Sequence, residues 1–196
     1  MPESGAVVVF TGALAGRSLS IKPKKCAGSV MMPLSTRAAA QAILADLSEA
    51  RVAMAHSVLE TIAETRTVAG DAFGHVLGIV VEQAQADESR VSLEIKPHML
   101  NPHGIAQGGV TYALADYAGG VAVFARLGSP NMVTQDMHLR YHGPARIGRI
   151  TARAHVTYQG TRTITTYCSV HQNDTLIASA TATFAILNPQ EVAALT

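Results

Sequence analysis

The sequence predicts an α+β fold in which an antiparallel sheet of about six strands wraps around one long central helix. The helix is expected at residues 108–127, where apolar residues occupy nearly every side, so its whole surface must be covered. Segments rich in Val, Ile and Thr precede and follow it, which is typical of strands. The connections between the later segments are short, and short connections favour antiparallel pairing.

Residues 1–34 are expected to form a poorly ordered extension or a leader. They contain a basic cluster, and no acidic residue occurs between Glu3 and Asp46, a bias that targeting segments share. The segment has neither the apolar core of a secretory signal nor an Arg-rich amphipathic helix. An extension is therefore the simpler interpretation.

Residues 35–67 follow a helical pattern, with Leu44, Leu47, Met54, Val58 and Ile62 at helical spacing. We expect an N-terminal helical segment of one or two helices that pack on the main domain or on a partner chain. The main domain, which contains the sheet and the central helix, is expected to comprise residues 68–190.

Many small residues make the central helix thin enough for a curved sheet to wrap around it, and with the element order this indicates the hotdog architecture. Gly128, with Pro130 just beyond it, is a typical helix end. The four strands after the helix are expected to form an antiparallel meander. Strands are expected at residues 75–83, 89–96, 132–141, 147–158, 161–172 and 176–187.

The composition narrows the possible partners and locations. Lys and Arg number 15 and Asp and Glu number 14, so a formal net charge of +1 provides no basic surface for nucleic acid. No apolar stretch approaches the ~18 residues of a membrane span, so no membrane partner is expected. Cys26 and Cys168 lie far apart, without metal or redox spacing, which favours a reducing, cytoplasmic location.

Residues 101–116 carry the strongest functional signal of the chain. Asp116 is a lone carboxylate two turns inside the apolar helix, and a buried carboxylate costs stability unless something uses it. Gly108 and Gly109 free backbone N–H groups at the helix N-terminus, where partial positive charge can hold an oxyanion. The residues alone leave a second interpretation open, in which the glycines allow close packing and Asp116 pairs with a buried Arg.

The spacing between Gly108 and Asp116 has a consequence for assembly. Eight residues correspond to about 12 Å along one helix, which is too far for both groups to act on one carbonyl. If they act together, Gly108 comes from one chain and Asp116 from a facing chain, so the site lies at a dimer interface. The Gly108 N–H would polarise a thioester carbonyl, and Asp116 would act as a general base for water or as a nucleophile.

The pattern of these residues resembles the PaaI-type acyl-CoA thioesterases, the phenylacetate-pathway branch of the hotdog superfamily. The family places an Asn, a Gly three residues later, a His-Gly-Gly or Gln-Gly-Gly triplet and an L-x-D sequence at fixed intervals. The likeness extends from about residue 74 to residue 187 and does not cover residues 1 to about 66. The matching positions are Asn101, Gly104, Gln107-Gly108-Gly109 and Leu114-Ala115-Asp116.

The resemblance implies hydrolysis of a small or medium acyl-CoA, aromatic ones included, to free acid and CoA. It implies that Gly108 is the oxyanion donor, that Asp116 of the facing subunit is the catalytic carboxylate, and that Asn101 lies near the thioester. Thr134 matches a hydroxyl that helps to place the attacking water, and Gln107 and Gly109 would contact substrate. Gln107 departs from the frequent His and does not titrate near neutrality. The resemblance implies no cofactor, no metal, and a homodimer or homotetramer.

Two other functions remain open at this stage. A hotdog dehydratase or hydratase usually brings a His to the site, whereas this chain has Gln107 there and lacks a His-Phe-Pro segment. A non-catalytic acyl-CoA-binding sensor gains nothing from Asp116. Cys168 is interpreted as a core residue rather than a nucleophile. Asp136, His138 and His142 share a strand face that could bind metal, but a solvated face is the simpler interpretation.

Overall fold

A computed structural model describes residues 34–64, 71–85 and 87–194. Apart from Leu34, the extension expected at residues 1–34 lies outside these described residues. The N-terminal helices are α1 (Leu34–Ala45), α2 (Glu49–Glu64) and α3 (Ala72–Leu77), and the central helix is α4 (Gly108–Leu127). The other elements are β1 (Val80–Gln85), β2 (Glu88–Ile95), the short 3-10 helix η1 (Pro97–Met99), β3 (Met132–Tyr141), β4 (Gly148–Gln159), β5 (Thr163–Gln172), β6 (Thr175–Ile186) and α5 (Pro189–Ala193).

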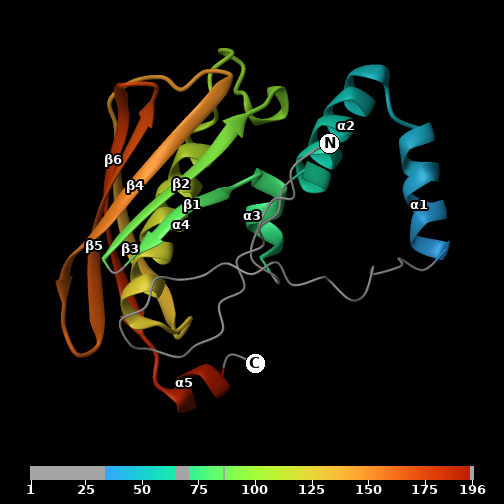
Figure 1. Cartoon of the computed structure of the whole chain (residues 1–196). Coiled ribbons are helices and arrows are strands. Elements are labelled where there is room, and N and C mark those ends of the chain that lie inside the picture. Colours follow the sequence, from blue (N-terminus) through green and yellow to red (C-terminus); the bar gives the residue numbers. More distant parts are fainter. Residues whose placement is uncertain (1–33, 65–70, 86, 195–196) are drawn as a thin grey trace, which may run out of the picture.

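The six strands form one antiparallel sheet in the order β1-β2-β4-β5-β6-β3. The sheet curves around α4, which packs against one of its faces (Figure 1). This arrangement confirms the predicted α+β hotdog fold. The core lies between α4 and the sheet, and its fully buried side chains include Leu114, Ile150 and Val170. In the described residues no helix is long and apolar enough to cross a membrane.

Small residues of α4 allow the sheet to approach closely, as the composition predicts. A Cβ added at Gly119 would lie 2.9 Å from Cζ of Phe184 and 3.1 Å from Oγ1 of Thr166. The helix ends at Gly128, which has a left-handed φ of 64° and donates its N–H to the carbonyl of Phe124. The helix boundaries expected from the sequence are confirmed.

The prediction of a strand at residues 75–83 is wrong for the first half of this range, because α3 occupies Ala72–Leu77 and β1 begins only at Val80. Both ends of α3 are capped. Asp71 accepts the N–H of Gly74 at 2.8 Å, and Gly78 closes the helix with a left-handed φ of 69°. Capping thus favours a short helix where the apolar pattern alone suggested a strand.

The meander expected for the last four strands is also wrong for β3. Strands β4, β5 and β6 are sequential neighbours, but β3 pairs with β6 at the sheet edge, and β2 pairs with β4. Residues 142–147 therefore cross the end of the β5–β6 hairpin. Their backbone is fixed by hydrogen bonds from His142 N–H to the Ile177 carbonyl and from Ala106 N–H to the Ala145 carbonyl, both 2.8 Å. A short connection can therefore join strands that are not neighbours.

Helix α2 packs beside α3 and η1, next to the main sheet (Figure 1). The Ser57 hydroxyl lies 2.9 Å from Nδ1 of His98, and the Lys96 ammonium donates to Glu64 at 3.1 Å. These contacts connect the N-terminal helical segment to the loop that precedes α4.

Candidate active site

The N-terminus of α4 presents the predicted glycine pair. Gly108 is the first helical residue, so its N–H has no acceptor within the helix. Among the described residues, no hydrogen bond uses this N–H. The Tyr141 hydroxyl donates to the Gly108 carbonyl at 2.8 Å, and a Cβ added at Gly108 would meet that hydroxyl oxygen at 2.8 Å. Nothing lies within 4 Å of a Cβ added at Gly109. A side chain at position 108 would therefore force Tyr141 or the helix to shift, whereas position 109 has room for one.

The loop before α4 is held by its own hydrogen bonds. The Asn101 side-chain oxygen accepts the His103 N–H at 2.9 Å, and the Asn101 N–H donates to the Ile105 carbonyl at 2.8 Å. The Gln107 N–H donates to the Met99 carbonyl at 2.8 Å, and the Gln107 side chain makes no capping bond. The Asn101 oxygen thus stabilises the loop, and the exposed Gln107 side chain stands at the helix entrance.

Asp116 lies on a different part of the helix, beside an apolar cavity. The Thr134 hydroxyl donates to Oδ1 of Asp116 at 2.9 Å, so the structure brings these two predicted residues together. Asp116 is only partly buried within one chain. The cavity has a volume of about 480 Å³ and runs along the face of α4 that is turned away from the core. It is lined by Asp71, Val81, Asp116, Tyr117, Gly120, Val121, Phe124, Pro130, Met132, Val133, Thr134 and Phe184.

The predicted site residues therefore fall into two groups. Asp116 and Thr134 line the cavity, whereas Gly108, Gln107 and Asn101 lie at or before the start of the helix and do not line it. Within one chain the two groups are separated by two turns of α4, or about 12 Å. A single chain brings no predicted carboxylate to the predicted oxyanion donor.

Two residues of the cavity were not singled out from the sequence as site residues. Tyr117 follows Asp116 on α4, and its hydroxyl interacts with Asp71, the cap of α3. Burial, followed by the contact with Asp71, raises the pKa of Tyr117 well above its usual value. Tyr117 therefore remains a protonated hydroxyl at neutral pH. No functional signal in the sequence pointed to Asp71.

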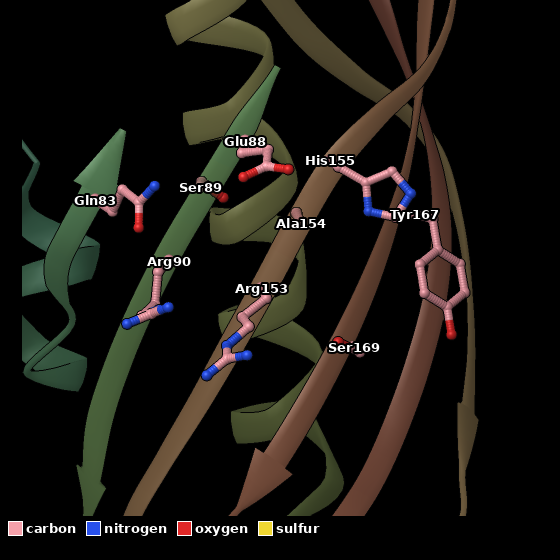
Figure 2. A pocket seen from close by; sticks show the side chains of 9 residues that line it. All are labelled: Gln83, Glu88, Ser89, Arg90, Arg153, Ala154, His155, Tyr167 and Ser169. Atoms are coloured by element: carbon pink, nitrogen blue, oxygen red, sulfur yellow. The ribbon is translucent and has the colours of Figure 1, made fainter. Parts of the chain in front are cut away.

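A second depression, of about 340 Å³, lies on the opposite face of the sheet. Figure 2 shows its side chains standing on the strands, with α4 behind them. Arg90 and Arg153 are direct cross-strand neighbours on β2 and β4, and His155 and Tyr167 pair in the next row. None of the predicted site residues lines this depression.

The remaining sequence interpretations concern cysteine and metal. Cys168 is buried in the core, and burial raises the pKa of its thiol to about 12, which confirms a packing role rather than a nucleophile. Within the part of the chain that the structure describes, no group of three His, Cys, Asp or Glu residues is placed to bind a metal.

The fold and the arrangement around α4 define a hotdog protein with a free helix N-terminus and a carboxylate beside an apolar cavity. The thioesterase superfamily matches residues 103–179. A mutant of the phenylacetic acid degradation protein PaaI from Thermus thermophilus is 34% identical, with a TM-score of 0.56, over 60% of this chain and 100% of that chain. A Ralstonia eutropha protein related to phenylacetic acid degradation is 28% identical, with a TM-score of 0.56, over 59% of this chain and 90% of its own.

Curated proteins also match. A Deinococcus radiodurans protein, provisionally described as an esterase, is 36% identical over 96 residues, which are 48% of this chain and 63% of that protein. The chain thus matches less than two thirds of the length of this relative. The chain belongs to the thioesterase superfamily.

Proposed function

We propose that the protein is an acyl-CoA thioesterase whose active sites form between two copies of the chain. The observation that carries the proposal is the division of the site. The oxyanion donor Gly108 and the carboxylate Asp116 lie on one helix but about 12 Å apart. Among the described residues the Gly108 N–H makes no hydrogen bond, and Asp116 lies beside the apolar cavity. Family membership supports thioester hydrolysis as the reaction.

Strand β3 relates the two parts of the site. Its residue Tyr141 bonds to Gly108, and its residue Thr134 bonds to Asp116, so the two groups lie beside opposite ends of the strand. β3 is also a ten-residue edge strand with a largely exposed surface. An edge strand is a natural place for a second chain to pair.

A two-fold axis through the middle of β3 would place the two strands antiparallel. The Tyr141 end of one strand would then lie beside the Thr134 end of the other. In this arrangement Gly108 of one copy faces Asp116 of its partner, and the dimer has two equivalent sites. We therefore propose a homodimer as the smallest active assembly, with a homotetramer formed by pairing dimers.

The reaction follows from the chemistry of these groups. The Gly108 N–H, at the positive end of the α4 dipole, donates a hydrogen bond to the thioester oxygen as negative charge develops on it. Asp116 removes a proton from water as the water oxygen bonds to the carbonyl carbon. The carbon–sulfur bond then breaks and the CoA thiolate leaves, taking up a proton. Attack by Asp116 itself, through an anhydride that water then hydrolyses, is the alternative course.

The other predicted residues have supporting roles in this proposal. Thr134 holds one oxygen of Asp116 and leaves the other for water. Asn101 shapes the loop beside the thioester, and Gln107 and Gly109 contact the substrate at the helix entrance. The apolar cavity accepts the acyl group, which is small or medium in size. Relatives named for phenylacetic acid degradation support an aromatic acyl group among the substrates.

The experiment that tests the proposal is thiol release from a panel of acyl-CoAs, from short aliphatic to phenylacetyl and benzoyl. Wild-type protein and Asp116→Asn are measured side by side. We expect turnover by wild type alone. Binding of acyl-CoA without turnover by either protein would contradict the proposal and favour a sensor.

A further inference from the structure

The outer face of the sheet, which is turned away from α4, carries a row of hydrogen-bond donors across four strands. Its members line the depression of about 340 Å³ shown in Figure 2, and the two guanidinium groups extend from neighbouring strands in the same direction. Guanidinium, amide and hydroxyl groups can all donate hydrogen bonds, so the row suits a ligand rich in acceptors. In order of cross-strand pairing, the row contains Gln83 of β1, Arg90 of β2, Arg153 of β4 and Ser169 of β5.

The charges of the two arginines are not paired within the protein. Like charges directly opposite each other on neighbouring strands are destabilising. In the described part of the chain, neither Arg90 nor Arg153 makes an ion pair, and the Nε of Arg90 is buried without a hydrogen-bond acceptor. An anion held between the two guanidinium groups would replace their repulsion with two attractions.

Two carboxylates lie near the row, and both are engaged or placed elsewhere. Glu82 of β1 pairs with Arg149 of β4. Glu88 lines the depression but stands in the next row, opposite His155. Figure 2 shows Glu88 at the end of the depression remote from the two guanidinium groups. The end that holds the arginines therefore keeps an excess of positive charge.

We propose that Arg90 and Arg153 bind the dianionic phosphate group of a small molecule on the outer face of the sheet. Each guanidinium presents a planar fork of donors that matches phosphate oxygens, and Gln83 and Ser169 extend the donor set on either side. The depression shares no residue with the cavity beside Asp116, so this inference does not rest on the proposed function.

The row beside the arginines favours a nucleotide as the carrier of the phosphate. His155 and Tyr167 line the same depression, with ring centroids 5.6 Å apart and ring planes at 48°. Aromatic side chains provide surfaces on which a base stacks. The expected ligand is therefore a nucleoside monophosphate, with its phosphate at the arginines and its base at the two rings. Inorganic phosphate is the other source of the same chemistry.

The test is calorimetry of the wild-type protein with adenosine monophosphate, inorganic phosphate and adenosine at constant ionic strength. The nucleotide is expected to bind roughly tenfold more tightly than phosphate, because stacking of the base adds to the phosphate contacts. Equal binding of the nucleotide and phosphate would assign the site to free phosphate. Adenosine binding as tightly as the nucleotide, or no binding of either phosphate compound up to about 10 mM, would overturn the inference.

Arginine variants connect the binding to the proposed residues. Arg90→Gln and Arg153→Gln are each expected to weaken binding of the nucleotide by roughly tenfold or more, because each removes a charged donor. Arg140→Gln is the matched control. Arg140 continues the same row on β3, through Ser179 of β6, and does not line the depression. Equal weakening in all three variants would indicate only a general attraction between charges, and the proposed site would be wrong.

Thermal unfolding distinguishes a lost site from a folding defect. Without anion, Arg90→Gln and Arg153→Gln should unfold at the wild-type Tm or above it, because each relieves the repulsion between the two arginines. The nucleotide should raise the Tm of wild type and Arg140→Gln, since a ligand that binds only the folded state stabilises it. It should leave the Tm of the other two variants unchanged. A similar rise in all four proteins would place the ligand elsewhere and refute the inference.

Discussion

At the scale of single residues, the account depends on two groups of α4 that differ in kind. In the proposed mechanism Gly108 acts through its backbone N–H, and a Cβ added at this position would meet Tyr141. In the proposed mechanism Asp116 acts through its side chain, which accepts a hydrogen bond from Thr134. Each role can be removed separately.

The first prediction concerns Asp116. Asp116→Asn keeps the size of the side chain and its bond with Thr134 but removes the base, so kcat is expected to fall by roughly 10²–10⁴. Thiol release measures the loss, and acyl-CoA binding should persist. Glu88→Gln, at an exposed carboxylate on the opposite sheet face, is the control and should be fully active. Turnover close to wild type in Asp116→Asn would remove this carboxylate from the mechanism.

The second prediction concerns the glycine pair. Gly108→Ala places a Cβ 2.8 Å from the Tyr141 hydroxyl, so the Tyr141 side chain or the helix N-terminus must shift, and activity should fall by at least tenfold. Gly109→Ala meets no atom within 4 Å and should fold and remain active. Activity assays and thermal unfolding of the two variants check this contrast. Equal losses in both variants would show that Gly108 has no special position.

At the scale of secondary-structure elements, α4 is the centre of the fold and the sheet adapts to it. The sequence predicts α4 to the residue, because its apolar pattern and the Gly128 stop are both local signals. The sequence does not predict α3, because the capping residues Asp71 and Gly78 favour a helix where the apolar pattern suggests a strand. It also does not predict that β3 pairs with β6. The pairing of β3 depends on hydrogen bonds between residues far apart in the sequence, and no local pattern encodes them.

The same limit applies to the candidate site. Asn101, Gly108 and Asp116 belong to one continuous motif, so sequence reasoning finds them. Tyr117 and Asp71 become neighbours only in the folded chain, so their contact is visible only in three dimensions. Their shared place in the cavity could not be predicted from spacing.

The third prediction tests the contact between α4 and the sheet. Gly119→Ala would place a methyl group 2.9 Å from Phe184, and overpacking of this kind costs about 1–3 kcal/mol of unfolding free energy. At Gly120 the nearest atom would be 3.8 Å away, so Gly120→Ala should be neutral or stabilise by up to about 1 kcal/mol through helix propensity. Urea unfolding of both variants distinguishes these outcomes. Stabilisation by both substitutions would mean that the sheet lies farther from α4.

The fourth prediction concerns the contact between α2 and the loop before α4. Burial, and then the charge of Lys96, lowers the pKa of His98 below its ordinary value of 6.5. The folded protein therefore binds fewer protons at His98 than the unfolded chain, so the stability linked to neutral His98 is present above that value. This stability is lost as the pH falls through 6.5 toward the lower folded pKa.

The measurement is the free energy of unfolding of wild type and His98→Gln at about pH 7.5 and pH 5. Wild type should lose more stability on acidification than His98→Gln, since carboxylate titrations are common to both proteins. An equal loss in the two proteins would mean that His98 titrates normally and that the Ser57 contact does not depend on its neutral form.

At the scale of the whole molecule, the proposed function assigns to one chain the halves of two different sites. The edge strand β3 contacts Gly108 at one end and Asp116 at the other, and a two-fold axis through β3 would join complementary halves. The protein is therefore expected to sediment as a dimer or a tetramer at every concentration tested. A stable monomer that retains full activity would be incompatible with a shared site.

The most direct measurement is complementation between two inactive variants. The first variant carries two substitutions. Gly108→Pro removes the backbone N–H, at the first helical position, which accepts proline. Tyr141→Phe removes the hydroxyl that the proline ring would otherwise meet. Gln107 already has φ −58° and ψ 134°, which suits a residue before proline. The other variant is Asp116→Asn, and Tyr141→Phe alone is the control, expected to be active.

The two inactive variants are unfolded together, refolded as a mixture and assayed for thiol release. In a mixed dimer one site receives both substitutions and the other receives Gly108 and Asp116 intact. Random mixing should therefore restore about a quarter of the wild-type activity, since half of the dimers are mixed and each has one intact site. A mixture as inactive as its two components would contradict the central claim that each site is built from two chains.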